Sequence, residues 1–359
     1  MDIYTSDSSD SDSREQKTLD YGRQNLITET LNDNLVNLYK TNKSYGDIET
    51  IFLNHNALKH LPPSIGKFYN LRTLDLSSNH LTSLPDVLAL CPLNSLIAKN
   101  NRLSNESLPK SLLSKCGDGM LRELNLSGNL FTHFPDNVLE LKGLKFLYLG
   151  GNQITSISKD IWKLQSLQVL SLGGNAITDV PETVGNLPLL QGLILCDNLI
   201  EHLPTSIAKL KNLKSLLLHK NRLKHLPRDI ITLKNLVELS LRENPLVVRF
   251  VQDISLSPAS LLELAARTIR TSSITYGPTD VPRTLMEYLQ SANCCVNPKC
   301  AGVFFDNRIE HIKFVDFCGK YRVPLLQYLC SSKCIEPVRE SEEPQPGASG
   351  FMMRKVLLG

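Results

Sequence analysis

The chain has 359 residues, of which 42% are hydrophobic and 21% charged, and its formal net charge is +3. This composition is ordinary for a soluble globular protein, and the length is sufficient for two domains with buried cores. The small net charge gives no reason to expect binding to nucleic acid or to an anionic membrane. No apolar run reaches the roughly 18 residues of a membrane-spanning helix, so we expect no membrane segment.

The N-terminal segment is acidic and rich in serine. Residues Met1 to Asp12 contain four Asp and no basic residue, so they do not resemble an export signal, and we expect the protein in the cytoplasm. Residues 1–20 are predicted to be disordered because they hold too few apolar side chains to form a core. Residues 21–46 are predicted to form a helical cap, since Leu31 and Leu35 recur at helical spacing.

A repeated motif dominates residues 47–255. The pattern LxLxxNxL, where x is any residue, occurs nine times with some lapses, and successive copies are usually 23 residues apart. Alternation in LxL places two leucines on one side of a short strand, and the Asn after the strand can bond backbone groups of neighbouring coils. No single coil can bury its own apolar face, so the copies are expected to stack into a solenoid. The nine asparagines are Asn56, Asn79, Asn101, Asn129, Asn152, Asn175, Asn198, Asn221 and Asn244.

These residues resemble the leucine-rich-repeat superfamily, in the short form whose motif is followed by Leu-Pro and which is typical of intracellular members. The resemblance implies an α/β fold, a solenoid of nine short repeats. It says little about function, because the fold serves many tasks. Cys196 and His219 fall near each other on one face, but no orienting carboxylate or oxyanion feature accompanies them, so we predict no enzymatic activity.

The strand positions that point away from the leucine core form the concave face of the solenoid. Solvated strand faces are normally polar, so apolar and aromatic residues here are candidate anchors for a partner protein. The alternative is that strand propensity alone favours such residues. The predicted partner-binding residues are Phe52, Ile97, Phe146, Tyr148, Ile194, Leu217, His219 and Arg242.

Two short helices are predicted after the last repeat, within residues 256–291. In the first, apolar side chains share one helix face, with Ser257 as the N-cap and Pro258 at the first helical position. The second helix begins at Pro282. An amphipathic helix at this point also suits a cap over the last coil, so partner docking and capping remain alternatives.

These helices resemble the paired boxes by which substrate receptors join elongin–cullin–RING ubiquitin ligases. The elongin C-binding box is written small-Leu-xxx-Cys-xxx-aliphatic, and here Ala265 replaces the usual Cys. The resemblance implies elongin B, elongin C and a cullin of the two or five type as partners, and the choice of cullin stays open. The elongin-box positions are Ser260, Leu261, Leu264, Ala265 and Ile269, and the cullin-box positions are Val281, Pro282, Leu285, Tyr288 and Leu289.

Six of the nine cysteines lie between residues 294 and 334. Cys295 and Cys300 form one closely spaced pair, Cys330 and Cys334 a second, and two such pairs can complete a tetrahedron of thiolates around a structural zinc ion. Clustered thiols in a reducing compartment bind metal more often than they form disulfides. We therefore predict a zinc-binding module at residues 292–336, followed by a flexible tail at 337–359. Unliganded core cysteines are the alternative, and Cys294 and Cys318 are spare.

Together these features predict a non-catalytic protein that holds a target protein on its concave face while its helices dock a ubiquitin ligase. The alternative is a signalling scaffold with the cysteine-rich module as a second interaction site. The order of repeats, helices and cysteine motifs also resembles one vertebrate member of the superfamily, over the whole chain except the first twenty or so residues.

Overall fold

The protein is described here from a computed structural model, which describes residues 17–41, 45–109, 120–246, 259–277, 279–317, 321–335 and 355–357. These residues fall into two compact units. The first unit holds those up to Leu223, Asp229–Asn244 and the strand at 355–357, and the second holds Lys224–Arg228 and those from 259 to 335. Among the described residues, no helix combines the length and the apolar character that crossing a membrane requires.

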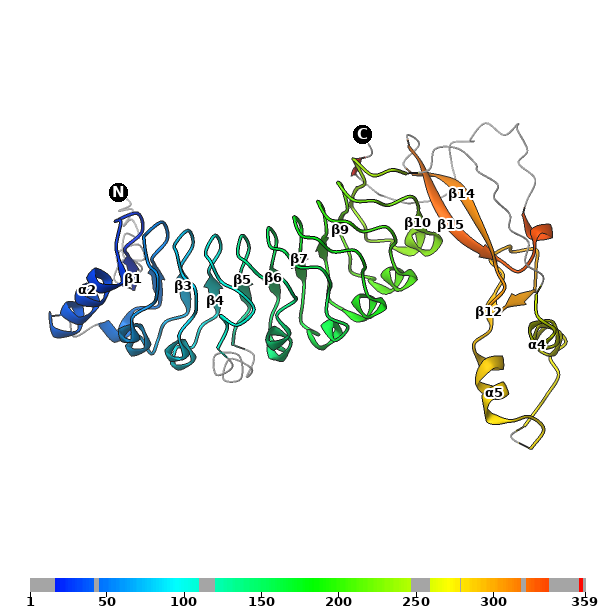
Figure 1. The fold of residues 1–359 in the computed structure, drawn as a ribbon, viewed down its shortest axis with the longest axis horizontal. Helices are drawn as coiled ribbons and strands as arrows, with labels where there is room; N and C mark the ends of the chain where they lie inside the picture. The colour runs from blue at the N-terminus through cyan, green and yellow to red at the C-terminus, as the bar shows by residue number, and fades with distance from the viewer. Residues whose placement is uncertain are drawn as a thin grey trace, which may run out of the picture. The chain divides into compact units, whose positions relative to one another are not determined.

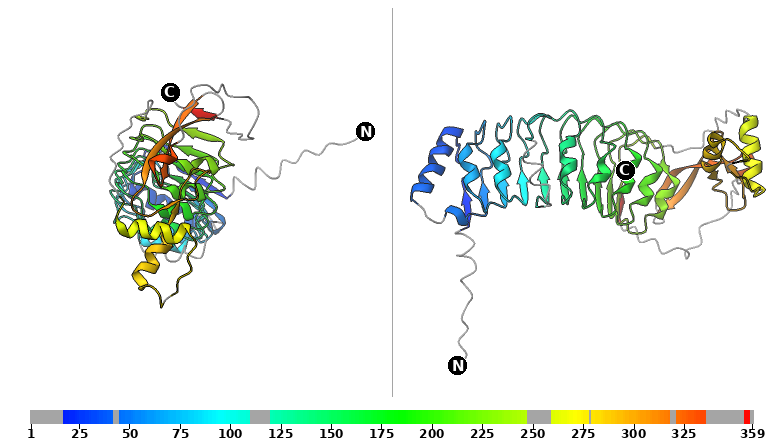
Figure 2. Two further views of the ribbon diagram at one scale, coloured as in Figure 1. Left: turned by 90° about the vertical axis from the view of Figure 1, so that its right-hand side faces the viewer. Right: turned by 90° about the horizontal axis from the view of Figure 1, so that it is seen from below.

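The first unit is built on an eleven-stranded parallel sheet whose strands follow the order of the chain (Figures 1 and 2). Each strand has three residues that pair in direct register with the next, as Leu170 does with Leu193. The nine strands predicted from the repeats are all present, and they are β2 (Thr50–Phe52), β3 (Thr73–Asp75), β4 (Ser95–Ile97), β5 (Glu123–Asn125), β6 (Phe146–Tyr148), β7 (Val169–Ser171), β8 (Gly192–Ile194), β9 (Ser215–Leu217) and β11 (Glu238–Ser240). The outer strands β1 (Thr18–Asp20) and β16 (Lys355–Leu357) extend it at both ends.

Leucine burial holds neighbouring coils together. The middle residue of each repeat strand and the second residue after it are fully enclosed, as are Leu193 in β8 and Leu195 just after that strand. Opposite the sheet, short 3-10 helices close most of the described coils and bury residues such as Ile65 and Ile207. These helices are η1 (Tyr45–Asp47), η2 (Pro63–Lys67), η3 (Asp86–Leu90), η5 (Asp136–Glu140), η6 (Ile161–Lys163), η7 (Glu182–Asn186), η8 (Thr205–Lys209) and η9 (Arg228–Thr232).

The asparagine of each repeat has the role that the motif predicts. Asn198 is buried, and its Nδ2 donates to the carbonyl of Leu195 in its own coil at 3.1 Å and to that of Leu172 in the preceding coil at 3.0 Å. Its Oδ1 accepts from the amide of Ile177 at 3.0 Å. All nine repeat asparagines bond both coils in this way, as the bonds of Asn56 and Asn244 at the two ends illustrate.

A degenerate tenth coil precedes the nine repeats. Leu19, Tyr21, Gln24 and Leu26 follow the same spacing as the motif, with Tyr in place of Leu and Gln in place of Asn. Asn56 bonds the carbonyl of Tyr21 and the amide of Leu26, as the later asparagines bond the coils before them. Residues 18–20, predicted to be disordered, therefore form strand β1 instead. The remaining residues 1–16 lie outside the described residues.

Helix α2 (Thr28–Thr41) lies within the segment predicted to be helical. It buries Leu31 and Leu35 completely. The hydroxyl of Ser64, in η2, donates to Asn32 on this helix at 3.0 Å, and the Tyr39 hydroxyl donates to the Ser64 carbonyl. These contacts place α2 against the first full coil (Figure 1).

The second unit contains both predicted helices and a long hairpin. Helix α4 (Leu261–Thr271) has Ser260 as its N-cap, and α5 (Arg283–Gln290) begins after Pro282. The predicted N-cap at Ser257 is therefore wrong, and the helix begins three residues later. The strands are β10 (Leu226–Pro227), β12 (Asn293–Cys294), β13 (Val303–Phe304), β14 (Ile309–Phe317) and β15 (Tyr321–Leu329), and η10 (Ser332–Cys334) follows.

The strands of this unit form two small sheets. The hairpin strands β14 and β15 pair antiparallel over nine residues each, and β10 adds parallel to β15. Strands β12 and β13, which precede β14 in the chain, pair antiparallel and form the second sheet. Its two buried clusters are small, since one contains Ala266, Leu289 and Phe305 and the other Leu329 with two cysteines, while Phe304, Val323 and Leu325 are also buried. A unit with so little apolar core needs additional stabilisation.

Candidate functional site

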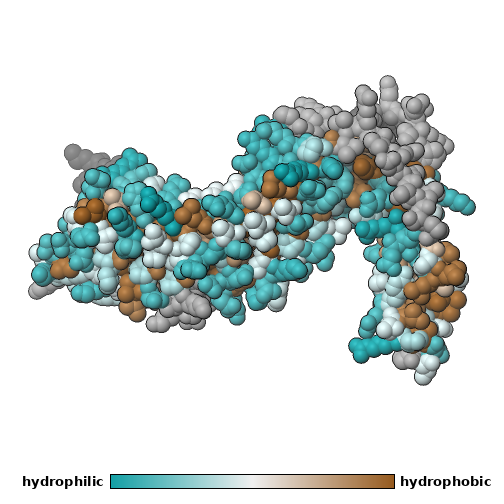
Figure 3. All heavy atoms as spheres, in the orientation of Figure 1, coloured by the Kyte–Doolittle hydropathy of each residue, from teal (hydrophilic) through white to brown (hydrophobic). Residues whose placement is uncertain are grey.

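Helix α4 presents an apolar face to solvent. Leu261 is 86% exposed, and Leu262 and Leu264 are each about half exposed. Ala265, one turn after Leu261, is exposed as well. Figure 3 shows an apolar patch in the region of α4. Three of the predicted elongin-box residues therefore lie together on a free surface, which is unusual for leucine side chains in a folded unit.

The opposite face of α4 packs inside the second unit. Ala266 is buried against Phe305 and Leu289, and Ile269 is partly buried at the edge of the same cluster. Ile269 was predicted to face a partner together with Leu261. The structure instead places it where the two faces meet, because its side chain packs against the cluster of Ala266, Leu289 and Phe305.

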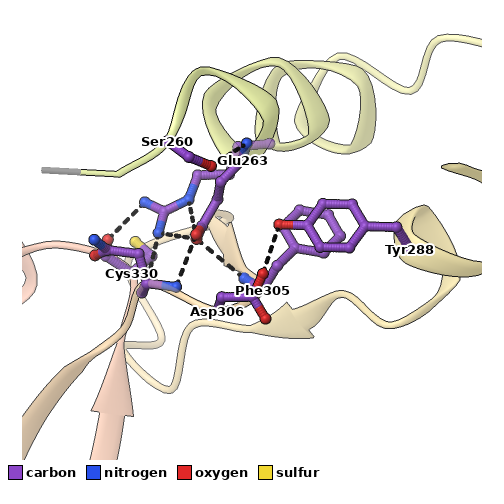
Figure 4. Close-up of polar contacts among 8 residues, drawn as sticks. Ser260, Glu263, Tyr288, Phe305, Asp306 and Cys330 are labelled. Carbon is purple, nitrogen blue, oxygen red and sulfur yellow. Dashed lines mark hydrogen bonds and ion pairs between the residues drawn. The ribbon is translucent and has the colours of Figure 1, made fainter.

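A buried carboxylate anchors this packed face. Glu263 is 1% exposed, and its two oxygens accept hydrogen bonds from the amides of Phe305 at 3.2 Å and Asn307 at 2.7 Å (Figure 4). Arg267, one turn on, also donates to it through Nε at 3.0 Å. Burial on its own raises the pKa of Glu263, but the hydrogen bonds from Arg267 and the two amides outweigh it and hold the pKa below its usual value.

Arg267 connects α4 to two further segments. Its Nη1 donates to the carbonyl of Cys330 at 2.8 Å, and its Nη2 donates to the carbonyl of Asn307. The guanidinium thus binds one side chain and two backbone carbonyls at once, which its fixed fork of donors allows. Neither Glu263 nor Arg267 was among the predicted site residues. Their i, i+4 spacing of opposite charges was the available signal, but it is typical of exposed helix faces as well.

The predicted cullin-box residues at the start of α5 and on the helix are not all exposed. Pro282 is exposed, and Val281 and Leu285 are half-buried. The Tyr288 ring stacks on Phe305 with centroids 4.7 Å apart, and its hydroxyl donates to Asp306 at 3.1 Å (Figure 4). Partial burial and this carboxylate raise the pKa of Tyr288 to about 12.

One cullin-box position is corrected by the structure. Leu289 is only 3% exposed and belongs to the core formed with Ala266 and Phe305. A residue enclosed in this way cannot contact a partner. Of the five predicted cullin-box residues, Leu289 is the one that lies in the core.

The four predicted cysteine ligands converge. The sulfur atoms of Cys295, Cys300, Cys330 and Cys334 all lie within 4.8 Å of one another. The Sγ of Cys330 lies 3.5 Å from that of Cys300 and 3.6 Å from that of Cys334. A tetrahedron with Zn–S bonds of about 2.3 Å has sulfur atoms about 3.8 Å apart, close to these separations. None of the four is in a disulfide.

The backbone at Gly302 lies very close to two of the sulfur atoms. The amide of Gly302 donates to the Sγ of Cys300 at 3.3 Å, and its carbonyl accepts from the amide of Cys295 at 2.8 Å. A Cβ atom at Gly302 would lie 2.8 Å from the Sγ of Cys330 and 3.0 Å from that of Cys300. Only glycine therefore lets the backbone approach both sulfurs so closely, and this residue was missed by the sequence analysis.

In the absence of a metal, the surroundings of the cluster favour neutral thiols. Burial, and then hydrogen bonding with the neighbouring thiols, raise the pKa of the Cys330 thiol above its usual value in the absence of a metal. Arg267 and Arg228 donate to the carbonyls of Cys330 and of Val296, which adjoins Cys295. Because the four sulfur atoms lie so close together, the cysteines could nevertheless hold a metal ion. Cys294 is exposed, and Cys318 lies outside the described residues.

On the concave face, the predicted residues line up across the strands. Phe52, Ile97, Tyr148, Ile194 and Leu217 occupy one row of direct register, in which Asp75, Asn125 and Ser171 alternate with them. All five are half-buried, as are Phe146 and His219, and Arg242 is exposed.

The apolar side chains are densest between β6 and β9. Phe146 pairs with Val169, a half-buried residue that the sequence analysis missed although its register position indicates it. Gly192, next in that row, leaves Val169 uncovered. Ile194 and Leu217 are direct neighbours in the other row. This part of the face combines apolar surface with a rigid strand scaffold, which suits contact with another protein.

The Cys196 and His219 pair lacks the features of a nucleophile and its base. Burial raises the pKa of the Cys196 thiol above its usual value, which disfavours the reactive thiolate. The His219 Nδ1 lies 3.2 Å from the hydroxyl of Ser240. The His219 ring thus lies beside Ser240, and the surroundings of Cys196 favour its neutral thiol.

Comparison with known proteins is consistent with the repeats. The family described as leucine rich repeat matches residues 120–177, 188–246 and 70–91. The chain is 62% identical over 320 residues to leucine-rich repeat-containing protein 58 of Xenopus laevis, an alignment that covers 87% of this chain and 90% of that protein. The human protein of the same name is 63% identical, with 87% of this chain and 85% of that protein covered.

The solved structures that resemble the chain share its repeats. The crystal structure of a TDR receptor superposes with a TM-score of 0.50 and 27% identity, covering 56% of this chain and 36% of that one. The chain thus spans about a third of that receptor. The likeness concerns the stacked coils, which serve protein interaction in many settings.

Proposed function

The chain belongs to the family of leucine-rich repeat-containing protein 58, and we propose that it is the substrate-recognition subunit of an elongin–cullin–RING ubiquitin ligase. It would bind a target protein on the repeats and join the ligase through α4 and α5. The chain itself would catalyse no step. Holding the target near the ligase raises the effective concentration of the target's lysines at the site of ubiquitin transfer.

The observation that carries this proposal is the free apolar face of α4. Leu261, Leu264 and Ala265 are exposed on a helix whose other face is fixed by Glu263 and Ala266. An amphipathic helix with leucine anchors one turn apart is a common way to fill a hydrophobic groove. The positions match the elongin-box pattern, in which Leu261 would enter a pocket of elongin C and Ala265 would pack beside it.

The cullin would be contacted from the start of α5. Pro282 is exposed there, and Val281 and Leu285 are partly accessible. Because Leu289 is enclosed and Tyr288 is held by Phe305 and Asp306, these two residues would support the contact from within rather than form it.

The target would bind on the concave face between β6 and β9. Phe146, Tyr148 and Val169 supply aromatic and branched side chains beside Ile194 and Leu217. Large, partly exposed aromatic groups on a rigid surface contribute most of the binding energy at typical protein interfaces. His219 and Arg242 would add polar contacts at the C-terminal side of this patch.

Zinc is the metal that the cysteine cluster would hold. Four thiolates with sulfur separations near those of a tetrahedron form a closed site of the structural kind, with no open position for catalysis. Such a site contributes folding energy directly, which suits a unit with a small apolar core. The four ligands would be Cys295, Cys300, Cys330 and Cys334.

The decisive experiment compares two neighbouring leucines of α4. Leu261 belongs to the elongin-box face, whereas Leu262 is also exposed but points to another side of the helix. Affinity of the purified full chain for recombinant elongin B–elongin C is measured by calorimetry. We expect Leu261→Ala to weaken binding about thirtyfold, the effect of losing a hot-spot side chain worth about 2 kcal/mol. Leu262→Ala should change it little.

A second variant tests whether elongin binding needs a small side chain at position 265. Ala265→Phe should abolish elongin binding because the larger side chain overfills the space beside Leu261. If the wild-type chain does not bind the elongin pair, or if the two leucine variants bind equally, the ligase role is wrong. A signalling scaffold that binds proteins through its repeats would then be the better description.

A further inference from the structure

We propose that a metal ion in the four-cysteine cluster is required to hold α4 in place, and that Arg267 and Glu263 are the positioning residues that connect the two. The partner that docks on α4 is taken from the proposed function. The dependence of α4 on the metal site is a property of the chain itself and can be tested without that partner.

The first connection is direct and passes through Arg267. Cys330 supplies one of the four sulfur atoms, and its carbonyl accepts from the Nη1 of Arg267 at 2.8 Å. A metal ion would fix the position of Cys330 by pulling its sulfur toward those of Cys300 and Cys334. It would thereby also fix the carbonyl of Cys330, which accepts a hydrogen bond from the guanidinium of Arg267.

The second connection runs through the segment that follows β13. Glu263 accepts from the amides of Phe305 and Asn307, and Arg267 also donates to the carbonyl of Asn307. This segment continues from Gly302, whose amide donates to the Sγ of Cys300 and whose carbonyl binds the amide of Cys295. Both cysteines of the first pair are thus tied to the backbone that holds Glu263.

The polar anchor matters because α4 has few apolar contacts. Among the described residues of the second unit, the core beneath α4 has three buried members, and only Ala266 comes from α4. The adjoining core consists of Leu329, Cys295 and Cys334, so two of its three buried members are sulfur ligands. Without a metal, this core would lose the bonds that hold its cysteines together. The segments to which Glu263 and Arg267 are hydrogen-bonded would then no longer be held in position.

The consequence is that the metal site and the docking helix act as one element. Loss of the metal would leave α4 without a fixed position, so its exposed leucines would no longer form one surface. This would happen although no ligand of the metal lies on the helix. The apolar patch would therefore be available to a partner only in the metal-loaded protein.

The test uses hydrogen exchange on the full chain purified with zinc. Metal content is measured by mass spectrometry of the element, then zinc is removed with a chelator and restored. We expect one zinc ion per chain, at least tenfold faster amide exchange in residues 261–271 after its removal, and recovery when zinc is returned. Exchange in the repeats, for example at residues 192–217, should not change. Absence of bound zinc, or equal protection of α4 with and without it, would overturn the inference.

Two arginine variants test the path. Arg267→Met keeps all four cysteines, and we expect it to bind zinc while α4 exchanges rapidly in both the loaded and the stripped protein. Slow exchange of residues 300–304 in the loaded variant verifies that the cluster itself has formed. Arg283→Met is the matched control, because Arg283 forms the same i, i+4 pair with Glu287 at 3.0 Å but is 90% exposed. It should behave as the wild type.

The outcomes separate this inference from the proposed function. If α4 of Arg267→Met depends on zinc as strongly as in the wild type, Arg267 is not the connection and the inference fails. If zinc-loaded wild type shows metal-dependent protection of α4 but does not bind elongin B–elongin C, the inference stands and the ligase role fails. If both hold, stripping zinc should also abolish elongin binding.

Discussion

At the residue scale, one asparagine per repeat connects each coil with the coil before it. Asn221 bonds the carbonyls of Leu218 and Leu195 and the amide of Ile200, at 2.8 to 3.0 Å. The bonded groups lie inside the solenoid, where water cannot replace the side chain. Because each coil depends on its neighbours, a defect in one asparagine weakens the contact between two coils.

This predicts a large effect from a small truncation. Asn198→Ala would leave the amide of Ile177 without a partner, which costs about 1–3 kcal/mol, and would remove one of the two asparagine donors to each of the carbonyls of Leu172 and Leu195, so we expect a loss of about 3 kcal/mol in the free energy of unfolding. Urea unfolding followed by circular dichroism measures it. Asn212→Ala is the control, since Asn212 binds the Pro188 carbonyl at an exposed position and should cost about 1 kcal/mol or less. Equal losses in the two variants would contradict this role of the repeat asparagine.

At the element scale, α4 combines an apolar face that is exposed with a charged residue that is buried. Ser260 accepts from the amide of Glu263 at 3.1 Å and fixes the start of the helix. Glu263 then turns inward to the amides of Phe305 and Asn307, so the leucines on the other face remain free. The arrangement inverts the usual pattern of a surface helix, in which leucines turn inward and charges outward.

The buried carboxylate predicts a pH-dependent contribution to stability. Glu263→Gln removes the charge opposite Arg267, and breaking one side of a buried pair costs about 3 kcal/mol, so the unfolding transition of the second unit should fall at neutral pH. Because the pKa of Glu263 is lowered in the folded state, this stabilisation is present above its usual pKa of 4.5 and is lost as the pH falls through the folded value. The difference between wild type and variant, measured by calorimetry, should therefore shrink in acid.

Glu287→Gln is the control for this measurement. Glu287 pairs with Arg283 in the same i, i+4 geometry, but both side chains are well exposed. Exposed pairs contribute little to stability, so this variant should unfold like the wild type at every pH. A Glu263 variant that behaves like the Glu287 variant would show that the inward hydrogen bonds do not stabilise the unit.

At the scale of the whole molecule, both edges of the parallel sheet are covered by strands from outside the nine repeats. Strand β1 pairs with β2 at one end, and β16 pairs with β11 at the other, with Val356 opposite Leu239. An uncovered edge presents free backbone donors and acceptors and is a common route to self-association. The two short strands therefore protect the solenoid where the repeats end.

Removal of residues 352–359 tests this protection. The shortened chain should expose the edge of β11 and self-associate as its concentration rises, whereas the full chain should not. Light scattering coupled to size-exclusion chromatography measures the mass of each. Removal of residues 1–16, which precede β1, is the control and should leave the mass at each concentration unchanged. A shortened chain with the same mass as the full one would mean that β16 does not protect the edge.

The tail differs from its prediction in one respect. Residues 337–359 were expected to be flexible, but 355–357 form strand β16. The apolar run Val356-Leu357 was visible in the sequence, but its partner strand lies more than a hundred residues away, at Glu238–Ser240. Pairing over such a distance leaves no local pattern, so only the folded chain identifies it.

The amino-acid sequence by itself determined the repeats, their strands and the role of their asparagines, because the coils share one pattern, usually 23 residues long, and each coil contacts only its neighbours. Local periodicity is sufficient for these features. The sequence also indicated Cys295, Cys300, Cys330 and Cys334 as one set, although Cys300 and Cys330 are 30 residues apart, because the spacing within each pair fits a turn and four thiols suit one metal ion.

Only the tertiary structure decided which side of each helix is free. The leucines of α4 and Leu289 of α5 have the same apolar character, but the former are exposed and the latter is enclosed. The difference arises because Phe305, Asn307 and Cys330, from segments 34 or more residues beyond Thr271 at the end of α4, supply the amides, carbonyl and aromatic ring against which this face of the helix packs. A helical pattern specifies that two faces exist, and contacts from distant parts of the chain select the buried one.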